Sequence, residues 1–164
     1  MKNNGEILAE ILREIRDCYF FLHNTKELSI VKKIMEEGLI YESRLLHTTD
    51  RVNPSRPVEI TYFMLERKEY GNFTIVIAVP EPVFDSYNRA AERYNTGIEE
   101  IMTITEPYYG NNEELVYTLS PRHVLGYFDS LLSGFTKNPR WDPSFNNTPE
   151  EKPSGKYFAP GKYR

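Results

Sequence analysis

Cysteine is nearly absent from this chain: Cys18 is the only one among 164 residues. A single thiol cannot form an intramolecular disulfide, and it cannot supply a thiolate cluster for a metal ion. Cys18 stands between a helical segment and an apolar one, which predicts a buried and inert side chain. The three histidines lie far apart in the sequence, so they do not predict a metal site either.

Long apolar runs are missing as well. Charged residues interrupt every early apolar stretch, so no signal peptide is predicted, and no segment approaches the roughly 20 apolar residues that cross a bilayer. We therefore expect a cytoplasmic protein with no membrane partner. The sequence also has no Gly-rich phosphate loop after a strand, no His-Glu-x-x-His motif and no Gly-x-Ser-x-Gly motif. These absences argue against P-loop nucleotide, zinc-protease and serine-hydrolase chemistry.

The chain has no excess of basic residues. Its 20 lysines and arginines face 24 aspartates and glutamates, which gives a net charge of −4. Proteins dedicated to nucleic acid usually carry a basic excess, so the charge does not favour a nucleic-acid partner. Basic residues do outnumber acidic ones from Lys137 onward, which fits either a solvated tail or a contact with phosphate or an acidic partner.

Aromatic residues are abundant at 13% of the chain, and twelve of them are tyrosines. The length suits one domain with a real core. We expect an α+β domain over residues 1–133, with a mostly antiparallel split sheet and flanking helices. Residues 134–164 are poor in apolar residues and show no periodicity, which predicts an extended or disordered aromatic and basic tail that clips aromatic side chains onto the domain.

The first forty residues predict a helix, a strand and a second helix. Residues 19–22 form an apolar run typical of a buried strand. Asn24 is expected to cap the following helix, with Glu27 completing a capping box, and Gly38 is expected to end that helix. The helices are predicted from apolar residues at helical spacing, which are Ile7, Leu8, Ile11, Leu12 and Ile15 in the first, and Leu28, Val31, Ile34 and Met35 in the second.

The rest of the domain is predicted to alternate between strands, loops and helices. Residues 73–79 are expected to pair in an antiparallel hairpin with residues 58–65, through a turn at 70–72. The last helix is expected to have Ser120 as its cap and Pro121 in its first turn. The other predicted elements are a long loop at 40–57 with a short strand at 44–47, a helix at 83–94, a strand at 101–105, a loop at 107–112, a strand at 115–119 and the last helix, to about 132.

Two His-x-Thr triplets are candidates for chemistry: His23-Asn24-Thr25 and His47-Thr48-Thr49. Paired triplets of this type are typical of two-histidine phosphoesterases, in which one imidazole acts as a base and the other as an acid. Those enzymes carry their motifs in two duplicated lobes. Here no duplication surrounds the two histidines, so the phosphoesterase remains the less favoured interpretation.

The favoured interpretation rests on the order of features around His23. An apolar strand leads to His23 and Thr25 at a turn, an amphipathic helix follows, and Gly38-Leu39 ends it. This order resembles the first motif of the ADP-ribosyltransferase superfamily, whose members cleave NAD. The resemblance implies that His23 hydrogen-bonds the adenosine ribose of NAD, and that His23 and Thr25 both belong to the NAD-binding site.

A second similarity to the superfamily lies in the segment Ile60-Thr61-Tyr62-Phe63-Met64. In the superfamily an aromatic residue on a central strand stacks on the nicotinamide ring. The segment is more similar to the DNA-targeting toxin branch than to the poly-ADP-ribose polymerases. The resemblance implies that either Tyr62 or Phe63 stacks, although one of two adjacent strand residues enters the core in any case.

A third similarity is a glutamate at the start of a late strand, in Glu114-Leu115-Val116-Tyr117. The resemblance implies that Glu114 hydrogen-bonds the nicotinamide ribose and stabilises an oxocarbenium-like transition state. Glu113 remains an alternative, because a register slip of one residue exchanges which of the two faces the site.

The toxin branch also uses an arginine to hold the phosphates of NAD or to position its reacting end. Arg44, Arg51 and Arg56 are all candidates, and we favour Arg51. A guanidinium group suits a pyrophosphate because it can donate two parallel hydrogen bonds.

Taken together, the resemblance predicts a mono-ADP-ribosyltransferase that takes NAD as a substrate. The acceptor is unidentified and is either a macromolecule or a small molecule. The alternative is a non-catalytic binding module on the same scaffold, in which the aromatic tail is the recognition element.

Overall fold

The computed structural model describes residues 3–41, 50–52, 71–103, 108–109, 115–132 and 134–149. The described helices are α1 (Asn4–Glu14), α2 (Leu28–Glu37), α5 (Glu81–Arg93), α6 (Ile98–Met102) and the 3-10 turn η2 (Pro121–His123). The described strands are β1 (Cys18–Thr25), β2 (Leu39–Tyr41), β3 (Asp50–Val52), β4 (Phe73–Pro80), β5 (Tyr108–Tyr109), β6 (Leu115–Leu119), β7 (Val124–Asp129) and β8 (Phe135–Lys137).

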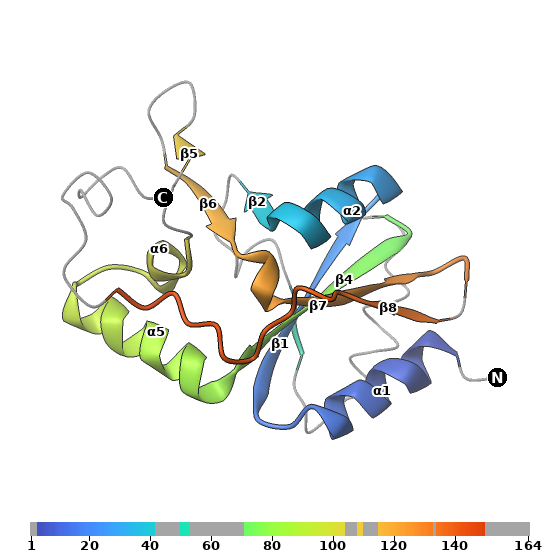
Figure 1. Cartoon of the computed structure of the whole chain (residues 1–164), viewed down its shortest axis with the longest axis horizontal. Helices are drawn as coiled ribbons and strands as arrows, with labels where there is room; N and C mark the ends of the chain where they lie inside the picture. Colours follow the sequence, from blue (N-terminus) through green and yellow to red (C-terminus); the bar gives the residue numbers. More distant parts are fainter. Residues whose placement is uncertain are drawn as a thin grey trace.

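The fold is α+β, with antiparallel sheets and flanking helices, as the sequence predicts (Figure 1). Among the described strands, five form the larger sheet in the order β3-β1-β4-β7-β8, and three form the smaller in the order β2-β6-β5. Every pair of neighbours among these described strands is antiparallel. No described helix combines the length and the apolar composition needed to cross a bilayer.

The larger sheet has an apolar cluster on each face. Its strands contribute to both clusters, because successive side chains of a strand point to opposite faces. Phe20 and Leu22 of β1 pack in one apolar cluster with Leu8 and Leu12 of α1. Phe21 lies in a second cluster, which also holds the buried side chains of α2 and α5. A strand buried on both faces is apolar throughout rather than alternating, which explains the unbroken apolar run at the start of β1.

Four sequence predictions for regular elements are confirmed in the described part. The helices α1 and α5 form where the sequence predicts them, and the strands β4 and β6 match the predicted bounds closely. Gly38 ends α2 with φ 94° and ψ 176°, as expected of a glycine stop. Short-range signals therefore suffice for the elements whose pattern is strong.

The predicted hairpin between residues 58–65 and 73–79 is wrong in its pairing. Every residue of β4 is paired with β1, and residues 73–77 are also paired with β7. A strand has only two edges, so β4 has no edge left there for the preceding segment. Residues 58–65 themselves lie outside the described residues.

Two further element predictions are wrong. Residues 98–102 form the helix α6 where a strand over 101–105 was expected. The helix expected from Ser120 to residue 132 is a single 3-10 turn, η2, followed by β7. Ser120 does cap this turn, since its side chain accepts a hydrogen bond from the Arg122 N–H. The chain then becomes a strand because β7 is buried between β4 and β8, and tertiary pairing overrides local helix signals.

The region after Gly38 also differs from the predicted loop. Residues 39–41 form β2 and residues 50–52 form β3, which pair with β6 and β1 respectively. The short strand expected at 44–47 lies outside the described residues. Asn24 is not a helix cap, because it lies within β1 opposite Thr74, and α2 starts after Glu27 without a side-chain cap.

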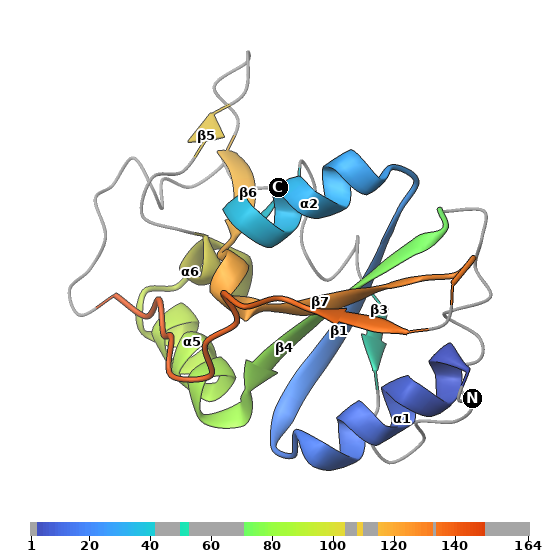
Figure 2. The same cartoon turned by 45° about the vertical axis from the view of Figure 1, so that its right-hand side comes forward.

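Residues 134–149 leave β7 and run back across the molecule. Residues 135–137 form β8, and the chain then crosses η2 and follows α5 as an irregular segment with turns at 139–140 and 143–144 (Figures 1 and 2). We call residues 138–148 the C-terminal strap. Phe135 of β8 packs against Phe128 with ring centroids 4.9 Å apart, in the cluster that α1 covers.

Candidate functional site

His23 and Thr25 lie in the last three residues of β1, not in a turn as the sequence suggested. Both side chains are half-buried, and their positions two residues apart place them on the same face of the sheet. His23 pairs with Ile75 of β4, and Ile75 pairs with Tyr127 of β7. Because Ile75 belongs to the cluster that α2 covers, His23 and Thr25 lie on the α2 face.

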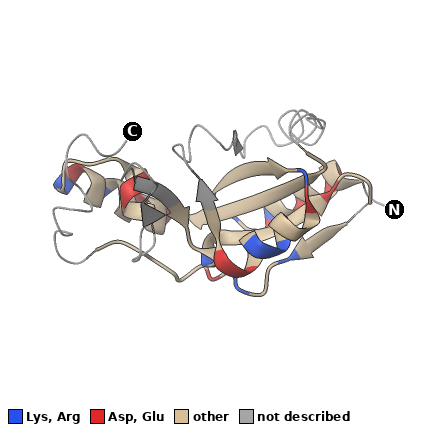
Figure 3. Ribbon diagram, turned by 90° about the horizontal axis from the view of Figure 1, so that it is seen from above, with Lys and Arg blue, Asp and Glu red and all other residues tan. Residues whose placement is uncertain are grey.

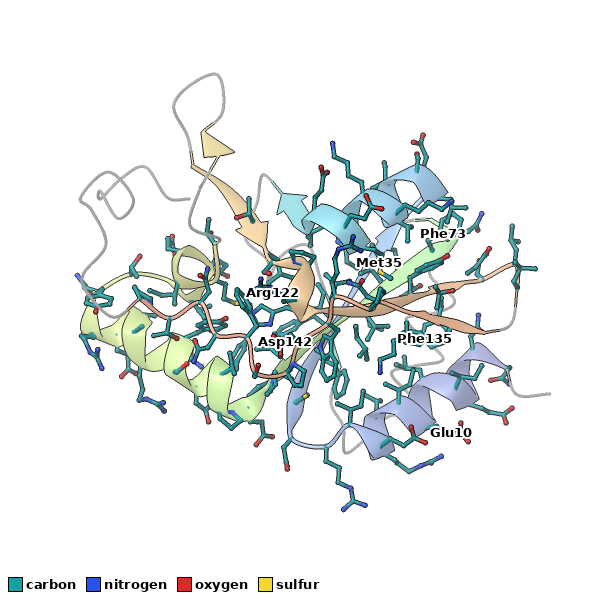
Figure 4. The ribbon with its side chains drawn as sticks, in the orientation of Figure 1. Glu10, Met35, Phe73, Arg122, Phe135 and Asp142 are labelled. Atoms are coloured by element: carbon teal, nitrogen blue, oxygen red, sulfur yellow. The ribbon has the colours of Figure 1, made fainter. Side chains whose placement is uncertain are left out.

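The surroundings of His23 and Thr25 on this face are aromatic and apolar. Thr25 pairs with Phe73, whose ring meets that of Tyr127 edge-on at 6.3 Å between centroids. Phe73 packs against the same cluster as Met35 of α2 (Figure 4). An imidazole and a hydroxyl about 7 Å apart along one strand can hydrogen-bond two separate polar groups of one ligand.

Of the other predicted site residues, the structure describes only the backbone of Arg51. Arg51 lies in β3 and pairs with Phe21 of β1, which is two residues before His23. The side chain of Arg51 lies outside the described part. The remaining candidates also lie outside the described residues; they are Tyr62, Phe63, Glu113, Glu114, Arg44, Arg56 and His47.

The described strands nevertheless connect the His23 segment to the segment of Glu114. The strand β6 begins at Leu115, the residue after Glu114, as the sequence predicts. It pairs with β2, which follows directly after α2 and Gly38. The chain that leaves β1 after Thr25 therefore crosses α2 and becomes the neighbour of the strand that Glu114 precedes.

At Gly38 the backbone after α2 lies close to the end of β6. A Cβ added at Gly38 would lie 2.1 Å from the Leu119 carbonyl oxygen and 3.1 Å from Cδ of Pro121. The backbone also has φ 94°, which side-chain-bearing residues rarely adopt. Only glycine lets the end of α2 approach the end of β6 this closely.

A buried polar group centred on His123 is the feature that sequence reasoning missed. The His123 side chain is fully buried, and its Nε2 lies 2.7 Å from the hydroxyl of Tyr87. The same hydroxyl accepts a hydrogen bond from the Asn147 N–H at 2.9 Å. The Tyr87 proton is then best placed to be donated to Nε2, which leaves the His123 proton on Nδ1, an atom with no hydrogen-bond partner.

Burial controls the protonation of this pair. Desolvation lowers the pKa of His123 from 6.5 to about 4, and the charge of Asp142 opposes this only in part. Burial also raises the pKa of Tyr87, with the Asn147 hydrogen bond acting in the other direction. Both groups are therefore neutral near pH 7, and they form a structural hydrogen bond instead of an acid–base pair poised for catalysis.

The C-terminal strap is held to the domain mainly by hydrogen bonds. The Trp141 indole N–H donates to the Ala78 carbonyl at 3.0 Å, just beyond the point where β7 stops pairing with β4. The Asn147 side chain donates to the Thr103 carbonyl at 2.7 Å. The Arg122 guanidinium lies 5.0 Å from the centroid of the Phe145 ring. The strap thus joins β4, η2 and the end of α6.

Asn138 anchors the start of the strap, and we expect Asn138→Ala to destabilise the protein by about 2–3 kcal/mol. Its buried amide donates to the carbonyls of Pro121 and Val124 at 3.2 and 3.0 Å, and both acceptors lose this donor on truncation. Urea denaturation followed by Trp141 fluorescence measures the change. The matched variant is Asn146→Ala, because Asn146 is exposed and its two hydrogen bonds, to the Ser86 hydroxyl and from the Thr148 N–H, are exposed as well. Equal loss in the two variants would contradict the anchoring role.

The sequence carried one weak signal for the strap. Its asparagines and aromatic residues stand in a segment without periodicity, which hides long-range pairing from any local pattern. From the sequence we expected only that aromatic side chains would attach this segment to the domain; its hydrogen bonds were not predicted. His123 itself follows a Ser-Pro turn and gives no sign of burial.

The described residues offer no site for a bound metal. No group of three or more His, Cys, Asp or Glu side chains within them is arranged to hold an ion. Lysine and arginine are interleaved with aspartate and glutamate on the described ribbon, without an extended field of one sign (Figure 3). The basic residues of the described ribbon thus form no continuous stripe of the kind typical of nucleic-acid binding (Figure 3).

Comparison of the chain with protein-family models, with curated proteins and with solved structures finds no match.

Proposed function

We propose that this protein is an NAD-dependent mono-ADP-ribosyltransferase. The observation that carries the proposal is the path of the chain from His23 to β6. His23 and Thr25 share one face at the end of β1, α2 packs on that face and ends at Gly38, and β2 then pairs with the strand that follows Glu114. The segments whose order in the sequence resembles the superfamily are therefore linked in space, from β1 through α2 and β2 to β6, and this supports the proposal.

The proposed roles follow from the chemistry of each side chain. His23 hydrogen-bonds the adenosine ribose of NAD, Thr25 belongs to the same NAD-binding site, and Tyr62 or Phe63 stacks on the nicotinamide ring. Arg51 holds the pyrophosphate, since a guanidinium donates two parallel bonds to phosphate oxygens.

The carboxylate of Glu114 has the chemical role in this scheme. It accepts a hydrogen bond from the nicotinamide ribose and stabilises the positive charge that develops as the bond between ribose and nicotinamide breaks. Nicotinamide leaves with the bonding electron pair. A nucleophilic atom of the acceptor then bonds to the ribose carbon and loses its proton.

Nicotinamide release from labelled NAD tests the proposal. We expect wild-type protein to release nicotinamide and Glu114→Gln to lose at least about a hundredfold of the rate, because the variant cannot stabilise the developing charge. Glu92→Gln is the matched control, since Glu92 is exposed on α5. If Glu113→Gln abolishes release and Glu114→Gln does not, Glu113 is the catalytic carboxylate.

His47 separates the proposal from the phosphoesterase. Of the two histidines, the transferase mechanism uses only His23, so His23→Ala should weaken NAD binding while His47→Ala leaves it nearly unchanged. Equal loss from both variants on a phosphodiester substrate would favour the two-histidine mechanism. If calorimetry detects no NAD binding and the labelled-NAD assay detects no nicotinamide release, the non-catalytic binding module becomes the better interpretation.

A further inference from the structure

The C-terminal strap takes part in burying the His123 imidazole. His123 belongs to η2, and its ring meets the Tyr87 ring of α5 edge-on, with centroids 5.7 Å apart. It also meets the ring of Phe145, a residue of the strap, at 5.1 Å. The guanidinium of Arg122 lies 5.0 Å from the centroid of the same Phe145 ring. Phe145 therefore contacts two neighbouring side chains of η2, and the strap covers the imidazole directly.

The strap is held more weakly than the elements beneath it. Its only buried side chain is Asn138, and residues 139–148 are half-buried or exposed. Where the strap crosses η2, the Asp142 N–H donates to the Arg122 carbonyl at 2.9 Å (Figure 4). Segments with few buried apolar contacts open at a lower free energy than the core. The strap beyond Asn138 is such a segment, since hydrogen bonds are its main attachment.

Two hydrogen bonds in series link the imidazole to the strap backbone. The Asn147 N–H donates to the Tyr87 hydroxyl at 2.9 Å, and that hydroxyl donates to Nε2 of His123, 2.7 Å away, when the ring carries its proton on Nδ1. A second proton must then go to Nε2, where it meets the proton of the hydroxyl. The hydroxyl proton must turn away, and its oxygen must accept from two donors at once. The attachment of Asn147 thus depends on a neutral imidazole.

The charged groups near His123 do not compensate for a second proton. Asp142 of the strap attracts it, but this carboxylate is only half-buried and accepts from the hydroxyl and the N–H of Ser144. These bonds hold the pKa of Asp142 below its usual value, so Asp142 stays ionised between pH 7 and pH 5. Arg122 of η2 is a cation beside Asp142. Apart from Tyr87, the side chains that α2, α5 and β4 turn toward this core are apolar, and the charged residues of α2 and α5 are exposed.

We infer that the C-terminal strap is an acid-released cover, in which protonation of His123 opens the chain beyond Asn138 while both sheets stay folded. Opening gives the imidazolium the water that the closed strap denies it. It also frees the Ala78 carbonyl, on the part of β4 that β7 leaves unpaired, and uncovers the Tyr87 hydroxyl. The segment that completes the fold at neutral pH thus exposes a new surface in acid.

Amide hydrogen exchange of the full chain, followed by NMR at pH 7 and pH 5, tests this release. After correction for intrinsic exchange, we expect the Asn147 N–H to lose about 20-fold of its protection. The pKa of His123 is about 4 under the closed strap and returns toward 6.5 when the strap opens. Asn147 should also exchange faster than the amides of β4 and respond little to dilute urea, as local opening does. His123→Gln should remove the loss in acid.

Phe145→Ala tests the cover without changing the group that titrates. Because Phe145 is half-buried on the strap, we expect the sheets to fold normally and an NMR titration to give a pKa of His123 raised toward 6.5. Arg140→Gln, exposed on the same segment, is the control and should leave this pKa at about 4. Exchange of Asn147 only together with β4, an equal loss in acid for His123→Gln, or a pKa of His123 unchanged by Phe145→Ala would each overturn the inference.

Discussion

Gly38→Ala is expected to destabilise the protein by on the order of 4 kcal/mol. The backbone there has φ 94° and ψ 176°, a region that is almost exclusive to glycine. The new Cβ would also lie 2.1 Å from the Leu119 carbonyl oxygen, which is backbone and cannot move without moving β6. The variant must either separate α2 from β6 or distort η2.

Gly134→Ala isolates the contribution of the close approach. Gly134 also has a positive φ, of 137°, but a Cβ built there meets no atom within 4 Å. Its expected loss is about 1–2 kcal/mol, from backbone strain alone. Urea denaturation of both variants, followed by circular dichroism, measures the difference. Equal losses would mean that the contact between Gly38 and Leu119 contributes nothing to stability.

Acidification from pH 7 to pH 5 is expected to reduce the free energy of unfolding by about 2 kcal/mol through His123. Its pKa is 6.5 when unfolded and about 4 when folded, because burial disfavours the imidazolium. Below pH 6.5 the unfolded chain takes up a proton that the folded chain refuses, so stability falls with pH. The loss continues to about pH 4, where it reaches about 3 kcal/mol.

His123→Gln is the control for this pH dependence. The glutamine amide can still accept from the Tyr87 hydroxyl but does not titrate, while His23 and His47 remain. The difference between the two stability curves therefore reports His123 alone. Trp141 is the only tryptophan and lies in the C-terminal strap, so its fluorescence follows the unfolding of the segment that covers His123. A wild-type curve as flat as that of the variant would disprove the buried neutral state.

Local patterns were sufficient where one face or one run of residues decides the structure. The apolar residues of α1, α2 and α5 repeat at helical spacing, and a helix needs only its own backbone to satisfy its hydrogen bonds. The stop at Gly38 was visible for the same reason. The prediction of a helix after Ser120 was wrong beyond its first turn. Ser120 does cap the turn η2, but the residues that follow form β7, whose backbone hydrogen bonds come from β4 and β8.

The candidate site was only partly accessible to the same reasoning. The sequence predicts His23 and Thr25 at a turn, but β1 extends through both residues because all eight of its positions pair with β4. His123 and Asn147 could not have been found, since each gains its role from partners on distant segments. Asn147 and Tyr87 lie 60 residues apart in the sequence.

The sequence by itself determined the helices α1, α2 and α5, the strands β4 and β6, the start of β1 and the glycine stop, because each depends on residues that are close together in the sequence. Tertiary structure alone decided which strands are neighbours, that the residues after His123 form a strand, and that a polar C-terminal segment follows α5 (Figure 1). Those features depend on hydrogen bonds between distant segments, and a strand or a buried imidazole is stable only when such a partner is present.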